Sequence, residues 1–283
     1  MDKKVNVRLV AVGSVFYELD LNRIQKWKSN FFQIEVVEER HYLPRKSDGR
    51  EDDTWEYSYE QLEKSLYKFR PSIGNELDLT IFVLDAPIEE DYLTYIIGPN
   101  RIVLTYYDAR DFMLKENIPL ENYLISNIYT YVFLLFSKLN SGQKPVLIKD
   151  DEDDITHDYR EGCIYDFCGT KEDIVFSCVK PIICNRCTKY LTEHGVAMED
   201  INQAKKELKR LKRNRYYQVV QWLKFHPMDS FFLSCFLAVI LSIIAGGVCE
   251  SCSCFCRVVA AIFFIIIALY LAKFLYSHFI RKT

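Results

Sequence analysis

Apolar and polar residues follow two different periods along the first 140 residues of the chain. Short runs of apolar and β-branched residues predict strands at residues 5–12, 31–42, 77–84 and 101–107. Apolar residues at helical spacing predict helices at residues 20–28, 58–69, 109–115 and 119–139. The last of these helices is apolar on nearly every side, so we expect it in the centre of the core. Alternating strands and helices predict an α/β domain with a mixed sheet and flanking helices.

Two longer apolar stretches lie near the C-terminus, at residues 231–248 and 258–275. A bilayer core requires about 20 apolar residues as a helix, and only residues 249–257 separate the two stretches. We therefore predict a transmembrane helical hairpin, which begins too late in the chain to be a cleaved signal peptide. The alternative is a pair of buried helices in a soluble core, but such helices normally keep a polar face.

The charged residues around these spans predict their orientation. Basic residues precede the first span at Lys205, Lys206, Lys209, Arg210, Lys212, Arg213 and Arg215. Because basic loops stay in the cytoplasm, we expect both termini on the cytoplasmic side of the inner (plasma) membrane. We predict that residues 198–225, which include these basic residues, form one helix that leads into the membrane and is capped by Asp200. Its charges are either solvated or in contact with anionic lipid headgroups, and direct nucleic-acid binding is the weaker interpretation.

The composition agrees with a folded domain that carries a membrane tail. The chain has 283 residues, a formal net charge of −3, 19 tyrosines and 19 phenylalanines, so extensive disorder is not expected. We divide it into a cytoplasmic α/β domain (1–149), a His/Cys zinc subdomain (150–195), a basic stem helix (196–226) and the transmembrane hairpin (227–283).

The cysteines nearest the stem predict a metal site. Cys184 and Cys187 form a C-x-x-C pair, and His157 and Cys163 are the best partners upstream. Four such ligands are typical of a closed structural zinc site, and a reducing cytosol disfavours disulfides. Cys168 and Cys178 are substitute ligands, and ordinary buried thiols are the alternative interpretation.

A second group of thiols lies between the two apolar spans. Its members are Cys249, Cys252, Cys254 and Cys256. On the outer side of the membrane they could form disulfides within or between protomers. Metal binding and free thiols are the alternatives. Disulfides between protomers would favour a homo-oligomer.

The metal-site region also resembles the end of archaemetzincin-type metalloproteases. The resemblance rests on residues 163–167, on Glu172 and Asp173, and on residues 183–191. It implies a zincin-type α/β domain with a structural zinc, in which His157 replaces the first cysteine of the family's ligand set. The H-E-x-x-H motif that binds catalytic zinc is absent, because residues 119–139 contain no histidine. The family's Met-turn methionine is missing as well, and Tyr165 lies near its place. The resemblance therefore implies a scaffold without a catalytic centre.

The layout of a cytoplasmic domain followed by two C-terminal spans resembles bacterial anti-phage membrane effectors, including those encoded beside retrons. This resemblance implies a non-enzymatic, toxin-like effector of antiviral defence by abortive infection, whose hairpin perturbs the lipid bilayer. Its partner would be a regulatory protein or a ribonucleoprotein, such as a reverse transcriptase with its nucleic acid. One alternative is a membrane-tethered zinc-dependent hydrolase that uses His157, Glu161 and Cys163. Another is an interaction domain with a passive anchor.

Overall fold

The computed structural model describes residues 4–13, 19–41, 43, 56–69, 78–107, 109–158, 160–168 and 173–214. These residues belong to a compact unit that spans Met1–Gln218. The strands are β1 (Val5–Val12), β2 (Phe32–His41), β3 (Asp78–Leu84), β4 (Thr94–Gly98) and β5 (Arg101–Thr105). The α-helices are α1 (Leu21–Gln25), α2 (Tyr59–Ser65), α3 (Ala109–Lys115), α4 (Leu120–Asn140), α5 (Asp150–Ile155), α6 (Asp173–Val179), α7 (Asn185–Glu193) and α8 (Met198–Leu208). The predicted transmembrane spans and the thiols between them lie outside the described residues.

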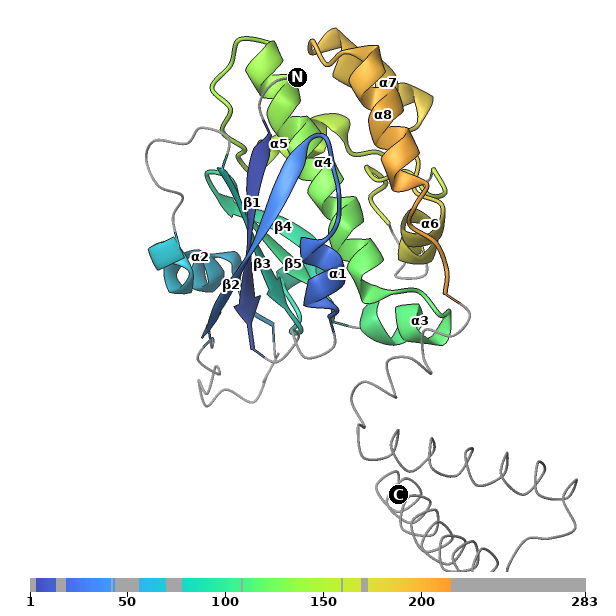
Figure 1. Cartoon of the computed structure of the whole chain (residues 1–283). Coiled ribbons are helices and arrows are strands. Elements are labelled where there is room, and N and C mark those ends of the chain that lie inside the picture. Colours follow the sequence, from blue (N-terminus) through green and yellow to red (C-terminus); the bar gives the residue numbers. More distant parts are fainter. Residues whose placement is uncertain are drawn as a thin grey trace, which may run out of the picture. The chain divides into compact units, whose positions relative to one another are not determined.

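The strands form one five-stranded mixed sheet in the order β2-β1-β3-β5-β4 (Figure 1). β1 pairs in parallel with β2 and β3, and β3 pairs in parallel with β5. β4 runs antiparallel to β5 and forms one edge of the sheet. The α/β class and the mixed sheet predicted from the sequence are confirmed. β4 was not predicted, because a run of only five residues, Thr94–Gly98, is too short to give a clear strand pattern.

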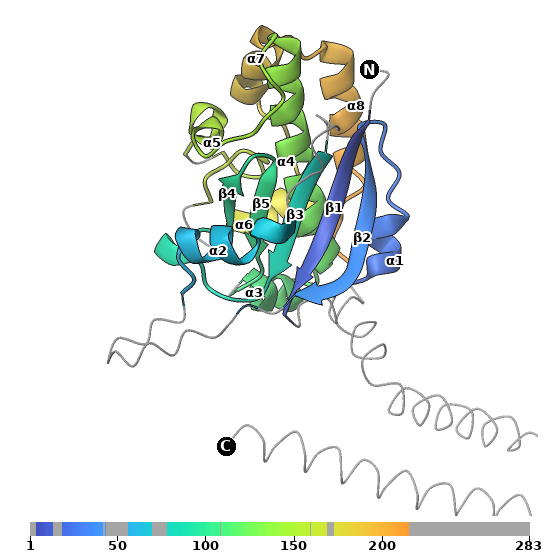
Figure 2. The same ribbon diagram turned by 90° about the vertical axis from the view of Figure 1, so that its left-hand side faces the viewer.

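Helices cover the two faces of the sheet unequally. On one face, α2 packs over a small core that includes Leu62, Leu66, Val10, Phe82 and Val103. On the other face, a larger core joins the sheet to α1, α4, α6, α7 and α8. Figure 2 shows α2 and α4 on opposite sides of the strands. Residues of the predicted His/Cys subdomain therefore share one continuous core with the sheet.

Helix α4 is the centre of the larger core, as its apolar sequence predicts. Its polar residues Glu121 and Asn122 are fully buried. Both are hydrogen-bonded, since Arg23 donates to Glu121 Oε2 over 3.1 Å and to Asn122 Oδ1 over 2.8 Å. Burial raises the pKa of the Glu121 carboxyl, whereas the Asp20 amide and Arg23 act in the opposite direction. Buried polar groups with such partners fix how a helix is rotated against its neighbours.

Local capping explains where several elements begin. Asp20 caps α1 by accepting a hydrogen bond from the Arg23 amide. Ser58 and Gln61 form a capping box at the start of α2. The helix predicted to run to residue 69 ends earlier, at Ser65, and a 3-10 turn, Tyr67–Phe69, follows it.

The long stem helix predicted over residues 198–225 is corrected by the structure. Helix α8 ends at Leu208, and its N-cap is Ala197, without a side-chain hydrogen bond from Asp200. Residues 211–214 are neither helix nor strand. The physical reason is tertiary: the side chain of Leu211 is buried in the core, and the Asn214 amide donates to the Asn117 carbonyl oxygen over 2.9 Å. Packing against the body therefore replaces helical hydrogen bonds.

Candidate metal centre

A loop between α5 and α6 positions the first two candidate ligands. His157 forms an isolated parallel bridge with Asp166. In it, the His157 amide donates to the Tyr165 oxygen over 3.2 Å, and the Phe167 amide donates to the His157 oxygen over 3.1 Å. The loop thus folds back on itself, so that His157 and Cys163 approach each other although six positions separate them.

Gly162 allows this loop to meet the segment before α7. Its φ is +80°, and a Cβ at this position would lie 2.9 Å from the Lys180 carbonyl oxygen. The close approach lets the Ile182 amide donate to the Gly162 oxygen over 2.8 Å, and Cys163 bridges Ile182 in parallel. Only glycine combines a left-handed φ with so little space. The bridge brings Cys163 next to the strand-like segment that ends at Cys184.

Helix α7 supplies the other two ligands. Cys184 is its N-cap residue, and Cys187 lies in its first turn, so their side chains share one face. The first turn of a helix carries free amides and a partial positive charge, which favour thiolates over thiols.

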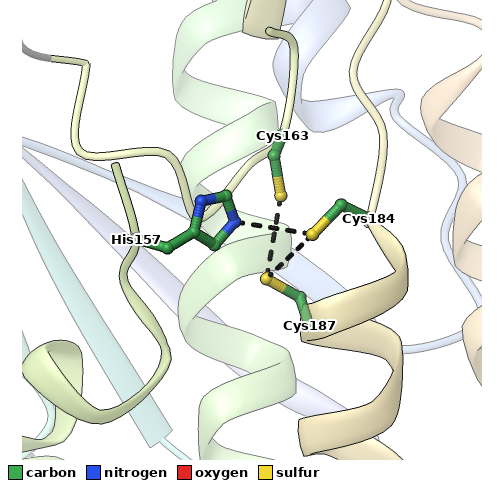
Figure 3. A group of neighbouring side chains, drawn as sticks. All are labelled: His157, Cys163, Cys184 and Cys187. Carbon is green, nitrogen blue, oxygen red and sulfur yellow. Dashed lines mark hydrogen bonds between the residues drawn. The ribbon is translucent and has the colours of Figure 1, made fainter. Parts of the chain in front are cut away.

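The four side chains point toward a common centre, as Figure 3 shows. The Cys184 Sγ lies 3.5 Å from His157 Nε2 and 3.6 Å from Cys187 Sγ. The Cys163 Sγ lies 3.8 Å from Cys187 Sγ. All four ligand atoms lie within 4.8 Å of one another, and all four residues are buried. A disulfide would require about 2.05 Å between sulfurs, so these cysteines are free thiols that could hold a metal ion.

The electrostatics of the cluster favour a thiolate at Cys163. The neighbouring Cys187 thiol, the amides of Cys184 and Tyr165, and the His157 ring lower the pKa of Cys163 to about 5, against the effect of burial. Hydrogen bonding to Cys163 and burial raise the pKa of Cys187. A bound cation would favour the deprotonated form of both thiols.

The two substitute ligands lie outside the cluster. Cys168 and Cys178 are free, and burial is the main cause that raises the pKa of both thiols, to about 12 for Cys168. A raised pKa keeps both thiols protonated, which disfavours metal binding. Of the alternatives that the sequence left open, the structure brings together His157, Cys163, Cys184 and Cys187.

A cavity of about 250 Å³ lies beside the centre, between β4, α4 and the loop that follows Ile164. Helix α4 contributes Asn127, Thr130 and Tyr131 to its wall, and Tyr165 donates from the loop to the Thr130 oxygen over 3.3 Å. None of the four clustered ligands lines this cavity. Glu161, one of the residues that the hydrolase alternative would use, is exposed on the turn before Cys163 and does not line the cavity either. The cluster and Glu161 therefore lie outside the walls of this cavity.

The basic residues predicted at the membrane surface differ in their surroundings. Lys205 donates to Thr188 Oγ1 over 2.9 Å, and Arg213 forms a 3.0 Å ion pair with Glu116. The Arg210 guanidinium lies 4.1 Å from the Trp27 ring centroid. Lys206, Lys209 and Lys212 also belong to the described residues, whereas Arg215 lies outside them. Contact of these residues with lipid stays a prediction.

Sequence reasoning missed a second group of buried polar residues, which includes Glu207, Tyr129 and Asn122. The signal was available, because the strongly polar residues of the apolar segment 119–139 are unusual in a buried helix. In the part of the chain that the structure describes, no helix is both long enough and apolar enough to span a bilayer.

Comparisons with known proteins return no similarity for this chain. No protein-family model, no curated protein and no solved structure matches it.

Proposed function

We propose that the cluster of His157, Cys163, Cys184 and Cys187 holds a structural zinc ion. Zinc bonds of about 2.3 Å to sulfur and about 2.05 Å to nitrogen place tetrahedral ligands about 3.8 Å apart for two sulfurs and about 3.5 Å apart for sulfur and nitrogen. The observed separations are 3.8 and 3.6 Å between sulfurs and 3.5 Å between sulfur and nitrogen. The observation that carries the proposal is the convergence of four buried donors, three thiols and one imidazole, whose ligand atoms all lie within 4.8 Å of one another.

The chemistry of the donors supports the same ion. Three thiolates and one imidazole are soft ligands that disfavour magnesium and calcium and suit zinc. Four protein ligands complete a tetrahedron, which leaves no position for a water nucleophile. The ion would therefore join the loop 157–163 to the start of α7 and take no part in catalysis.

Metal content of the full-length chain in detergent tests this proposal. We expect about one zinc per chain, which falls below about 0.1 in a Cys184→Ser variant. Cys168→Ser is the matched control, because Cys168 lies outside the cluster, and it should retain its zinc. Metal-free wild-type protein that folds and melts like the loaded protein would contradict a structural role.

For the whole chain we propose a membrane-anchored effector without enzymatic activity. The two apolar spans at residues 231–248 and 258–275 support membrane insertion, and the closed metal cluster supports a scaffold that recognises a partner. The resemblance of the layout to retron-associated effectors supports a role in antiviral defence, with a reverse transcriptase ribonucleoprotein as the candidate partner.

Induced expression in bacteria tests the effector. The full chain should depolarise the inner membrane and stop growth, whereas a chain without residues 231–275 should do neither. Toxicity that survives this deletion would exclude the hairpin as the acting part. A hydrolytic activity that Glu161→Gln abolishes, while zinc and fold are retained, would instead favour the tethered hydrolase.

A further inference from the structure

The last described residues of the chain are fastened to the body by an unusual number of specific contacts. We call residues 207–214 the strap. It connects α8 to the part of the sequence that contains the predicted membrane spans. Most strap residues have a body contact, and the contacts come from three separate regions: the turn after α1, helix α4 and the loop between α3 and α4.

The first anchor is the carboxylate of Glu207, which is 6 % exposed. The Tyr129 hydroxyl, from the centre of α4, donates to Glu207 Oε2 over 2.5 Å. The Asn30 amide donates to Glu207 Oε1 over 3.2 Å. The Trp27 indole in turn donates to Tyr129 over 3.2 Å. A carboxylate held by donors from two regions is a strong and directional attachment.

The second anchor lies one turn further along the chain. Arg210 stacks on the Trp27 ring and donates to the Lys28 carbonyl oxygen over 2.5 Å. Between and after these polar contacts, Leu208 and Leu211 are buried in the main core. Burying two leucines contributes about 3 to 6 kcal/mol in this kind of environment.

The third anchor is the amide side chain of Asn122, which is fully buried. Its nitrogen donates to the Lys212 carbonyl oxygen over 3.1 Å and to the Cys178 oxygen over 3.0 Å. At the end of the strap, the Asn214 amide donates to the Asn117 oxygen over 2.9 Å. In a continuous helix that amide would donate to the carbonyl of residue 210.

The sequence of the strap, however, favours a helix. Residues 209–213 are lysine, arginine and leucine, all strong helix formers, and no glycine or proline occurs between Met198 and His226. The structure shows these residues as a strap held by the body, whereas their helix propensity favours a continuation of α8. Such a conflict between local preference and tertiary contacts is typical of a segment with two packings.

We propose that the strap is a releasable contact between the body and the C-terminal membrane segment. In the held state residues 207–214 stay packed against α4 and the turn after α1. Release by a partner that competes for these contacts would free Arg210 and Arg213 and let α8 extend toward the membrane. The regulatory half of this inference rests on the proposed membrane effector, whereas the existence of the held strap does not.

Limited trypsin digestion of the full-length chain in detergent tests the held strap directly, because the strap contains four lysines and arginines. Asn122→Ala removes an anchor from the body side, and Arg210→Ala removes one from the strap side. We expect cleavage after Lys209, Lys212 and Arg213, the sites that every variant keeps, to be about tenfold faster in each variant than in the wild type. Asn127→Ala is the matched control on the same helix, since Asn127 donates only to the Tyr123 oxygen among the described contacts. It should change the rate less than about twofold.

Cleavage after Lys189, in α7, reports opening of the whole body and separates release from unfolding. If cleavage after Lys189 accelerates as much as cleavage of the strap, the whole body has unfolded in that variant. Selective release of the strap is then refuted for that variant. Arg210→Ala leaves the buried network of α4 intact, so it remains informative if Asn122→Ala does not fold. Equal strap cleavage in the wild type and both variants overturns the held strap.

Membrane depolarisation at equal protein levels then tests the regulatory half. Release variants should depolarise cells at about tenfold lower induction than the wild type, and Asn127→Ala should behave as the wild type. Faster strap cleavage with unchanged depolarisation would refute the regulation and leave the strap itself established. No depolarisation by any chain, including the wild type, would refute the effector instead.

Discussion

Replacement of Cys184 by serine should lower the thermal stability of the body by a predictable amount. Cys184 is the ligand that joins His157 to Cys187, with distances of 3.5 and 3.6 Å to their ligand atoms. A serine oxygen is a harder and shorter donor, so zinc affinity should fall at least about a hundredfold. Free zinc buffered at about a thousand times the wild-type Kd stabilises the fold by about 4.1 kcal/mol, and the same zinc concentration would stabilise the variant by only about 1.4 kcal/mol.

The difference of about 2.7 kcal/mol corresponds to a Tm lower by about 5 to 11 °C for a unit of this size. Circular dichroism melts of the full-length chain in zinc-buffered detergent with a non-thiol reductant measure it. Cys168→Ser should melt within about 2 °C of the wild type. The reasoning is refuted if Cys184→Ser and the wild type melt together in zinc, or if a chelator leaves the wild-type Tm unchanged.

Three further predictions concern other buried groups. Tyr129→Phe removes the donor to Glu207 and should lower the free energy of unfolding by about 1.5 to 3 kcal/mol in urea titrations; a cost below about 0.5 kcal/mol would contradict the anchor. Gly98→Ala places a Cβ 2.2 Å from Nη2 of the buried Arg101 and should cost about 1 to 3 kcal/mol in the same assay; an unchanged urea midpoint would refute it. The pKa of Glu121 is raised in the folded state, so its contribution to stability falls as pH rises from the unfolded value through the folded value. Glu121→Gln lacks this loss, and its stability relative to the wild type should therefore improve between pH 4 and pH 7, whereas a constant difference would contradict the raised pKa.

The sequence predicted those elements whose pattern is set locally. The apolar run of β3 and the nearly uniform apolar character of α4 depend on burial, which composition reveals directly. The metal ligands were predictable for a related reason, because the C-x-x-C pair of Cys184 and Cys187 needs only one helical turn to converge. The residue types His and Cys therefore predicted the candidate ligand set better than the spacing between its two halves did.

Other features depend on tertiary contacts that no local pattern contains. The choice of Cys163 over Cys168 and Cys178 follows from the bridge to Ile182, which pairs two segments on either side of α6. The end of α8 at Leu208 depends on contacts with Asn117 and Asn122, so helix propensity alone extended the helix too far. The edge strand β4 is short, and its pairing with β5 is visible only once both strands are placed.

The position of the metal centre has a consequence for the order of folding. Its four ligands lie between residues 157 and 187, whereas the sheet requires β1 to find β3 over a separation of 72 residues at Asn6 and Asp78. Contacts between residues close in sequence form faster, because less chain entropy is lost in closing the loop. The loop around the metal and the start of α7 can therefore assemble as a local unit before the long-range strand pairing is complete. Zinc supply during synthesis would then decide whether residues 157–187 are folded before they pack against the sheet.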